Sequence, residues 1–236
     1  MDTEEPPLPP DPELLNRQPK WFKPVLYMCV GASALFAIIL LLVGPRVLRP
    51  THRRADLTEA ISNARQIGFA LFEFETEYGF HPNGATSALV TTDYPAHGYD
   101  LTGSSSNDLF RQLFAAEITQ SERMFYARVP GVIKPDGVIS HGEALKESEV
   151  GFAYISGLTS IATDPLTPLV LTPLIPGTTK FDPKPFKGKA AILHIDNSVR
   201  TYDIHKDGHV YDKGINLLSP KHPVWKGKAP DIRYPE

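Results

Sequence analysis

The densest group of side chains that could do chemistry lies in the stretch HIDNSVRTYDIHKDGHVYD, residues 194–212. Two of its histidines, His205 and His209, have the four-residue spacing that zinc ligands take on a helix. Asp207 and Gly208 lie between them and favour a turn, and the flanking residues favour strands. We therefore interpret these side chains as the polar surface of a hairpin. The candidates so interpreted are His194, Asp196, Asp203, His205, Asp207, His209 and Asp212.

Metal binding is not well supported by this stretch. A catalytic zinc ion needs a third protein ligand, which the sequence does not clearly provide. Calcium prefers carboxylate and carbonyl oxygens, which are present, but their spacing is not that of an EF-hand loop. We therefore assign no metal-ligating residue and expect no cofactor. The residues with suitable oxygens are Asp196, Asn197, Asp203, Asp207 and Asp212.

Motifs of other catalytic classes are missing from the sequence. It contains no Gly-x-Ser-x-Gly turn, no Walker sequence and no dinucleotide-binding fingerprint. The serines of SGLTS, residues 156–160, come without an identifiable base or oxyanion donor. We therefore name no catalytic or cofactor-binding residue and predict that the chain is not an enzyme. An envelope metalloenzyme is the least favoured alternative.

Composition restricts the partners and the covalent chemistry. The chain has 236 residues and a formal net charge of -3, which gives no basic footprint for nucleic acid. We expect no nucleic-acid partner. Because Cys29 is the only cysteine, the sequence excludes an intramolecular disulfide and argues against a cysteine-based metal site. The length fits one domain of ordinary size with an appended segment.

The N-terminal part of the chain has the pattern of a membrane anchor. Residues 1–20 are acidic and proline-rich, and we predict a disordered tail. The run VLYMCVGASALFAIILLLV, residues 25–43, carries no charge and is long enough to cross a bilayer. Aromatic and lysine residues precede it, as in interfacial anchors. We predict a transmembrane helix over 21–46, with a cleaved signal peptide as the alternative.

A second helix is predicted from about Arg53 to Tyr78. Pro45 and Pro50 should separate it from the apolar run, and Gly79 supplies a stop. Apolar and small residues recur in it at three- and four-residue steps, which makes one stripe. We expect this stripe to pack on a sheet of the same domain. Its members are Leu57, Ile61, Ala64, Ile67, Gly68, Leu71, Phe74 and Tyr78.

The remaining sequence predicts short elements and a β-rich C-terminal half. The strongest signal is a hairpin within residues 189–212, with a first turn at Asp196 and Asn197 and a second at Asp207 and Gly208. Trp225 is expected to be a packing residue of the C-terminal tail. The other predicted segments are a loop at 83–104, a helix near 105–117 capped by Ser106 or Asn107, a strand at 122–129, a helical turn at 142–148, and strands at 150–158 and 169–175.

The order of these elements resembles type IV pilin-like proteins and the pseudopilins of type II secretion. The resemblance spans roughly residues 55–236 and implies an α+β fold. That fold has an N-terminal transmembrane helix, then a long amphipathic helix packed on a small antiparallel β-sheet, with a pilin-like extracytoplasmic domain over 51–236. The blocks that carry it are ARQIGFAL (64–71), GFHP (79–82), SSNDLFRQLF (105–114), PLIPGTTKFDPKPF (173–186), AAILHIDNSVRTYDI (190–204) and KHPVW (221–225).

One region departs from the pilin pattern. Prepilins carry a Gly, Phe or Met, Thr, Leu and Glu site before the membrane helix, whereas this chain has RQPKWFKPVLYM at 17–28. The apolar run also lacks an acidic residue. The departure predicts a permanently anchored domain rather than a polymerising subunit. The calcium loop of some pseudopilins has no residue-by-residue counterpart here.

The resemblance also implies a location and a function. Basic residues are nearly balanced on the two sides of the apolar run, so charge alone does not orient it. The resemblance implies a single-pass inner-membrane protein with a cytoplasmic N-terminus and a periplasmic domain. We expect a structural or interaction component of an envelope secretion or pilus-type system, with the lipid bilayer and envelope proteins as partners. The alternative is a tethered module that binds a polysaccharide, peptide or ion.

Overall fold

The computed structural model describes residues 22–236, except for the side chains of residues 22, 23, 26, 40–53 and 141. The tail predicted over residues 1–20 lies outside the described residues. The described chain falls into two compact units that divide between Pro50 and Thr51. Its architecture is α+β, with helices and an antiparallel sheet, as the sequence predicts.

Helix α2, Phe22–Tyr78, contains both the apolar run and the predicted second helix. The prediction that Pro45 and Pro50 separate two helices is wrong, because α2 is continuous across both. A proline removes one N–H donor and crowds the carbonyl four residues earlier, which weakens a helix without always ending it. Gly79 follows the last helical residue at a φ of 76°, the left-handed conformation that often ends a helix.

The membrane span predicted over 21–46 falls in the N-terminal part of α2, of which the structure describes only some side chains. Among the residues that the structure describes in full, no helix is long and apolar enough to cross a membrane. The predicted span over 21–46 includes residue 21 and the side chains of 40–46, which lie outside the described set. The described side chains between Pro24 and Ile39 are all exposed.

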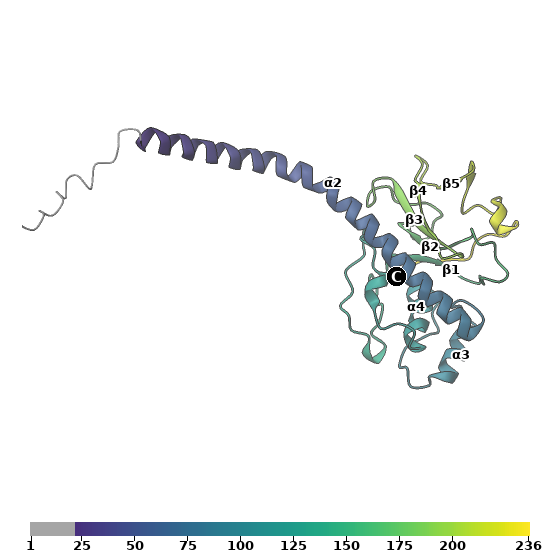
Figure 1. Ribbon diagram of the computed structural model, residues 1–236. Helices are drawn as coiled ribbons and strands as arrows, with labels where there is room; N and C mark the ends of the chain where they lie inside the picture. The colour runs from purple at the N-terminus through teal and green to yellow at the C-terminus, as the bar shows by residue number, and fades with distance from the viewer. Residues whose placement is uncertain (1–21) are drawn as a thin grey trace, which may run out of the picture. The chain divides into compact units, whose positions relative to one another are not determined.

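The C-terminal part of α2 packs on the sheet through the predicted stripe (Figure 1). Its buried residues lie on one face because they recur at helical spacing. They share a core with Tyr154, Val170 and Leu193 of the sheet, so the prediction of a helix on an antiparallel sheet is confirmed. The buried apolar residues of α2 are Ala60, Ala64, Ile67, Ala70, Leu71 and Phe74.

The main sheet has five strands in the order β4-β3-β2-β1-β7, and every neighbouring pair is antiparallel. Strands β1 to β4 follow one another as a meander, and β7 comes from the C-terminal tail and pairs with β1. A separate pair, β5 and β6, follows the hairpin. The strands are β1 Ala153–Ile155, β2 Pro168–Thr172, β3 Lys189–His194, β4 Val199–Asp203, β5 Tyr211–Asp212, β6 Ile215–Asn216 and β7 Ile232–Arg233.

Both faces of the sheet are covered. Side chains alternate along β1, so that Tyr154 enters the core with α2 while Ala153 and Ile155 enter a second core. The second core is closed by the C-terminal segment, where Trp225 is buried and donates its Nε1–H to the Leu217 carbonyl at 2.7 Å. The packing role predicted for Trp225 is therefore confirmed.

Helix α4, Ser106–Ala115, has its N-cap one residue before the nearer of the two predicted caps. Its N-cap is Ser105, whose hydroxyl accepts the N–H of Asp108, while the Asp108 carboxylate accepts the Ser105 N–H. This reciprocal pair satisfies two N–H groups that a helix end leaves open. The prediction of Ser106 or Asn107 as the cap is wrong, because both side chains are buried and bond to other segments.

Two further local predictions are corrected. The segment 83–104, predicted as a loop, contains helix α3, Thr86–Asp93. The segment 122–129, predicted as a strand, contains the 3-10 helix η1, Glu122–Phe125, and the buried Glu122 carboxylate accepts N–H groups from the loop beyond. The helical turn predicted at 142–148 begins at the last residue of the 3-10 helix η2, Ser140–Gly142. A last 3-10 helix, η3, is Pro223–Trp225.

Candidate functional site

The hairpin within residues 189–212 forms as predicted, but its polar side chains are dispersed. Asp196 lies in the turn between β3 and β4, where its Oδ1 accepts the N–H of Ser198 at 2.9 Å. Asp203 on β4 forms an ion pair with Lys189 on β3, with 2.6 Å between Oδ1 and Nζ. These two carboxylates support the hairpin itself and do not face a common point.

At the second turn, around Asp207 and Gly208, the polar side chains also form local hydrogen bonds. Asp207 Oδ2 accepts the hydroxyl of Tyr211 at 2.6 Å, and His209 Nδ1 lies 3.2 Å from the Thr179 carbonyl oxygen. His205 is exposed, and its ring is tilted by 58° against the Tyr211 ring, with 4.7 Å between the ring centres. Within the described residues, no group of three or more His, Cys, Asp or Glu side chains could hold a metal ion.

His194 is buried inside the sheet rather than exposed on the hairpin. Its Nδ1 lies 2.6 Å from the Leu166 carbonyl oxygen and its Nε2 lies 3.0 Å from the Tyr202 hydroxyl. With Nδ1 donating to the carbonyl, Nε2 accepts from the hydroxyl, so the neutral ring satisfies both partners. Burial lowers the pKa of His194, which favours this neutral state.

Asp212, one of the polar residues singled out in the sequence, lies beside the buried His222 at the edge of a cavity. Its Oδ2 lies 3.6 Å from Nε2 of the buried His222, and both residues line a cavity of about 160 Å³. An aspartate that orients an imidazole is typical of general-base sites. The residues lining this cavity include no Ser, Thr or Cys, so the pair lacks such a nucleophile. Sequence reasoning missed His222, because the pairing depends on the fold of the C-terminal tail.

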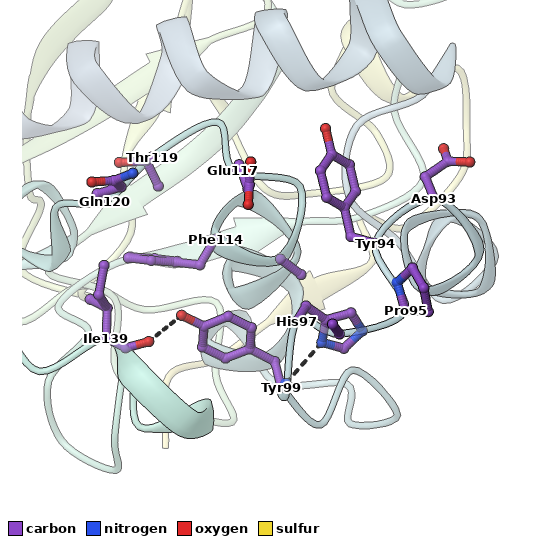
Figure 2. Close-up of a pocket in the computed structure, with 12 residues that line it drawn as sticks. Asp93, Tyr94, Pro95, His97, Tyr99, Phe114, Glu117, Thr119, Gln120 and Ile139 are labelled. Atoms are coloured by element: carbon purple, nitrogen blue, oxygen red, sulfur yellow. Dashed lines mark hydrogen bonds between the residues drawn. The ribbon is translucent and has the colours of Figure 1, made fainter.

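A larger pocket, of about 490 Å³, lies between the segment after α3 and the end of α4 (Figure 2). We call it the acidic pocket. Its residues come from three stretches of chain, so the fold of the 51–236 unit assembles it. The pocket is lined by Asp93, Tyr94, Pro95, Ala96, His97, Tyr99, Phe114, Ala115, Glu117, Thr119, Gln120 and Ile139.

Hydrogen bonds hold two of the aromatic side chains of the acidic pocket in place. Figure 2 shows the Tyr99 hydroxyl donating to the Ile139 carbonyl oxygen. It also shows the His97 ring accepting the Tyr99 N–H at Nδ1, with 2.8 Å between the nitrogens. The Nε2 of His97 then lies 3.3 Å from the Thr91 hydroxyl. These bonds fix the rings before any ligand arrives.

The acidic pocket has a negative electrostatic character. Asp93 and Glu117 are its charged lining residues, and its lining contains no Lys or Arg. Neither carboxylate forms an ion pair with another described residue. The pKa of the Tyr94 hydroxyl is raised, first by Glu77 on α2, then by burial, Glu117 and Asp93. Glu77, Glu117 and Asp93 therefore all contribute negative potential at the Tyr94 hydroxyl.

Glu117 occupies an unusual position for its residue type. It follows the C-cap of α4 with a φ of 58°, in the left-handed region. Its N–H bonds to the Phe114 carbonyl and the next N–H, of Ile118, bonds to Leu113, which is the Schellman pattern. Glycine is the usual residue there, and a carboxylate at a helix C-terminus also opposes the helix dipole. Two local costs therefore accompany the placement of this carboxylate in the pocket.

Sequence reasoning did not find the acidic pocket. Residues 93–99 read DYPAHGY and fall in the segment predicted only as a loop. The available signal was the mixture of aromatic and acidic side chains in so short a loop.

Comparison with known proteins identifies no relative, since no protein-family model, no curated protein and no solved structure matches this chain.

Proposed function

We propose that this chain is a membrane-anchored, pilin-like structural or interaction component of a bacterial envelope secretion or pilus-type system. Its N-terminus would lie in the cytoplasm and the domain over 51–236 in the periplasm. The observation that carries the proposal is the apolar surface of the N-terminal part of α2, whose described side chains are exposed.

That surface is large and continuous along the helix. Its large apolar side chains have exposed fractions between 46% and 75%. Soluble monomers rarely leave a contiguous apolar surface of this kind in water, and a helix that is apolar on all sides is normally buried in protein or lipid. A bilayer is the simplest cover for it. The side chains are Val25, Tyr27, Met28, Val30, Leu35, Phe36, Ile38 and Ile39.

A second surface favours an interaction role for the same helix. Phe69 and Phe72 are three residues apart on α2, on the face turned away from the buried stripe, and are 65% and 61% exposed. They stand among polar neighbours, including Arg65, Glu73 and Thr76. A pair of exposed aromatic rings with a polar rim is typical of a protein contact. We propose that this face contacts an envelope partner or a second copy.

The sequence at the start of the helix limits the role. No acidic residue occurs in the apolar run, and the segment before it lacks the prepilin cleavage pattern. The proposal is therefore a fixed anchor that presents its domain to a machine, without cleavage or filament growth.

Alkaline carbonate extraction of membranes from cells that express the full chain tests the anchor. The wild-type chain should stay in the pellet. Replacing Leu35 and Ile38 with arginine should release a large share of it, because a charged side chain is costly in the hydrocarbon core. Ile161→Arg, at a position that is 96% exposed in the domain, is the matched control and should remain in the pellet.

Two results would contradict the anchor. One is recovery of the wild-type chain in the carbonate supernatant, and the other is equal release of the L35R/I38R variant and the control. Orientation is read from the same cells with a cysteine at Ile161 in a Cys29→Ser background. Labelling by a membrane-impermeant maleimide in spheroplasts supports a periplasmic domain, and labelling only after lysis refutes it.

A further inference from the structure

We infer that the acidic pocket binds an organic cation, namely an ammonium or guanidinium group carried by a small amine or by a basic peptide side chain. The inference goes beyond the proposed function, and it depends neither on membrane anchoring nor on assembly. It rests on the shape of the pocket, its aromatic walls and the sign of its charge, which are three separate observations.

The shape is that of a small-molecule site. A volume of about 490 Å³ lies within the roughly 300–1,000 Å³ of typical ligand pockets. It is much larger than a single metal ion requires, and the described residues offer no cluster of three metal ligands. A butylammonium or propylguanidinium chain is of a size that such a pocket can surround.

The walls carry aromatic rings suited to a cation. Tyr94, Tyr99 and Phe114 line the pocket together with the His97 ring, as Figure 2 shows. The face of an aromatic ring attracts ammonium and guanidinium groups, most strongly where water is partly excluded. Because Tyr99 is already bonded to Ile139, its ring need not be ordered on binding. Pre-ordered rings reduce the entropy lost when a ligand binds.

The charge selects the sign of the ligand. Asp93 and Glu117 line the pocket from two different elements, the end of α3 and the residue after the C-cap of α4. Neither is neutralised by a basic side chain among the described residues. An anionic ligand such as a phosphate or a carboxylate would be repelled. A neutral apolar ligand would gain no electrostatic attraction from either carboxylate.

Isothermal titration of the full chain in detergent tests the inference with a matched pair of peptides. The first is acetyl-Gly-Lys-Gly amide, and the second replaces lysine with norleucine, which has the same length and no charge. The lysine peptide should bind and the norleucine peptide should bind at least about tenfold more weakly. Raising the salt concentration should weaken the lysine peptide further, because the site is partly open.

Variants assign the binding to the pocket. D93N/E117Q should weaken binding of the lysine peptide by about tenfold or more, since both changes keep the side-chain size. E147Q, an exposed glutamate outside the pocket, is the control and should leave binding unchanged. Tyr94→Phe should retain the affinity and Tyr94→Leu should reduce it, because only the first keeps an aromatic face.

Butylammonium separates the two sources of the cation. If it binds as tightly as the lysine peptide, the pocket recognises a free amine, and if the peptide binds at least tenfold more tightly, the pocket recognises a side chain in its backbone context. The inference is overturned if the lysine and norleucine peptides have equal affinity, or if D93N/E117Q binds as the wild type does. It is also overturned if neither cation binds up to about 10 mM.

Discussion

Gly68 of α2 faces Asn197 of the β3–β4 turn with no room between them for a side chain. A Cβ at Gly68 would lie 1.9 Å from Oδ1 of Asn197 and 3.1 Å from Cδ1 of Leu193. Asn197 has a φ of 59°, and its Oδ1 is buried without a hydrogen-bond partner among the described residues. The backbone of the helix therefore lies directly against the Asn197 side chain, and any Cβ at position 68 would have to displace it.

Gly68→Ala should destabilise the domain by about 1–3 kcal/mol, because the added methyl group must displace the Asn197 side chain and press on Leu193. Alanine is the better helix former by about 1 kcal/mol, so a net loss reports the clash. The measurement is urea unfolding. Gly84→Ala, where a Cβ would meet nothing within 4 Å, is the control and should be nearly neutral.

The double variant G68A/N197G should recover most of that loss. Glycine removes the Oδ1 that clashes and tolerates the left-handed φ of this position. Equal unfolding midpoints for G68A and the Gly84 control would show that the contact is not tight. Failure of N197G to rescue G68A would show that the strain lies elsewhere.

Two buried histidines, His81 and His194, should make the domain less stable at mildly acidic pH. His81 is buried beside the buried Glu75, with 3.6 Å between Nε2 and Oε2, and burial lowers its pKa while Glu75 opposes the shift. His194 also has a lowered pKa because of burial. At these two histidines the unfolded chain therefore binds more protons below pH 6.5 than the folded chain does. Stability should be fully present above about pH 6.5 and should fall as the pH is lowered through 5.5.

His81→Asn and His194→Asn test this sign, because asparagine keeps a donor near the position of Nδ1 and does not titrate. Each variant should be less stable than wild type at pH 7.5, yet lose less stability between pH 7.5 and pH 5.5. The exposed His205→Asn serves as the control and should follow the wild-type slope. Unfolding curves with identical pH slopes in all four proteins would contradict the account.

Glu117→Gly should raise the free energy of unfolding by about 1 kcal/mol. Glycine adopts the left-handed C′ conformation without the steric cost of a Cβ, and the change removes a carboxylate from the negative end of α4. Glu147→Gly, at an exposed position with a negative φ, should not stabilise the chain. Measured by thermal unfolding, a lower midpoint for Glu117→Gly than for wild type would contradict this prediction. Loss of cation binding in the stabilised variant would show that the costly placement of Glu117 serves the pocket.

Much of the fold could be predicted because its signals are local. The stripe of α2 recurs at helical spacing, and the β3–β4 hairpin combines alternating residues with a turn at Asp196 and Asn197. Helix α3 was not predicted because it contributes little to the core: only Thr86 and Val90 are buried. Strand β7 was not predicted because two residues of the tail carry no pattern, and their pairing with β1 is set by the rest of the fold.

The candidate sites were harder to predict for the same reason. The contact between Asp212 and His222, and the pocket that Asp93 and Glu117 share, involve residues that lie ten and more positions apart, in segments with no regular period. Sequence reasoning gave weight to the histidines and aspartates of residues 194–212 because they are dense. The structure shows that turns attract such side chains for their own hydrogen bonds.

Site-specific photocrosslinking from position 72 in intact cells tests the proposed function most directly. A photoreactive residue replaces Phe72 on the exposed face of α2, and another replaces the exposed Lys134 as a control in the same domain. The account predicts a discrete adduct from position 72, in the membrane fraction, with an envelope membrane protein or a second copy of the chain. It predicts no such adduct from position 134. A chain in the membrane fraction that forms no adduct at position 72 above that at position 134 would contradict the account.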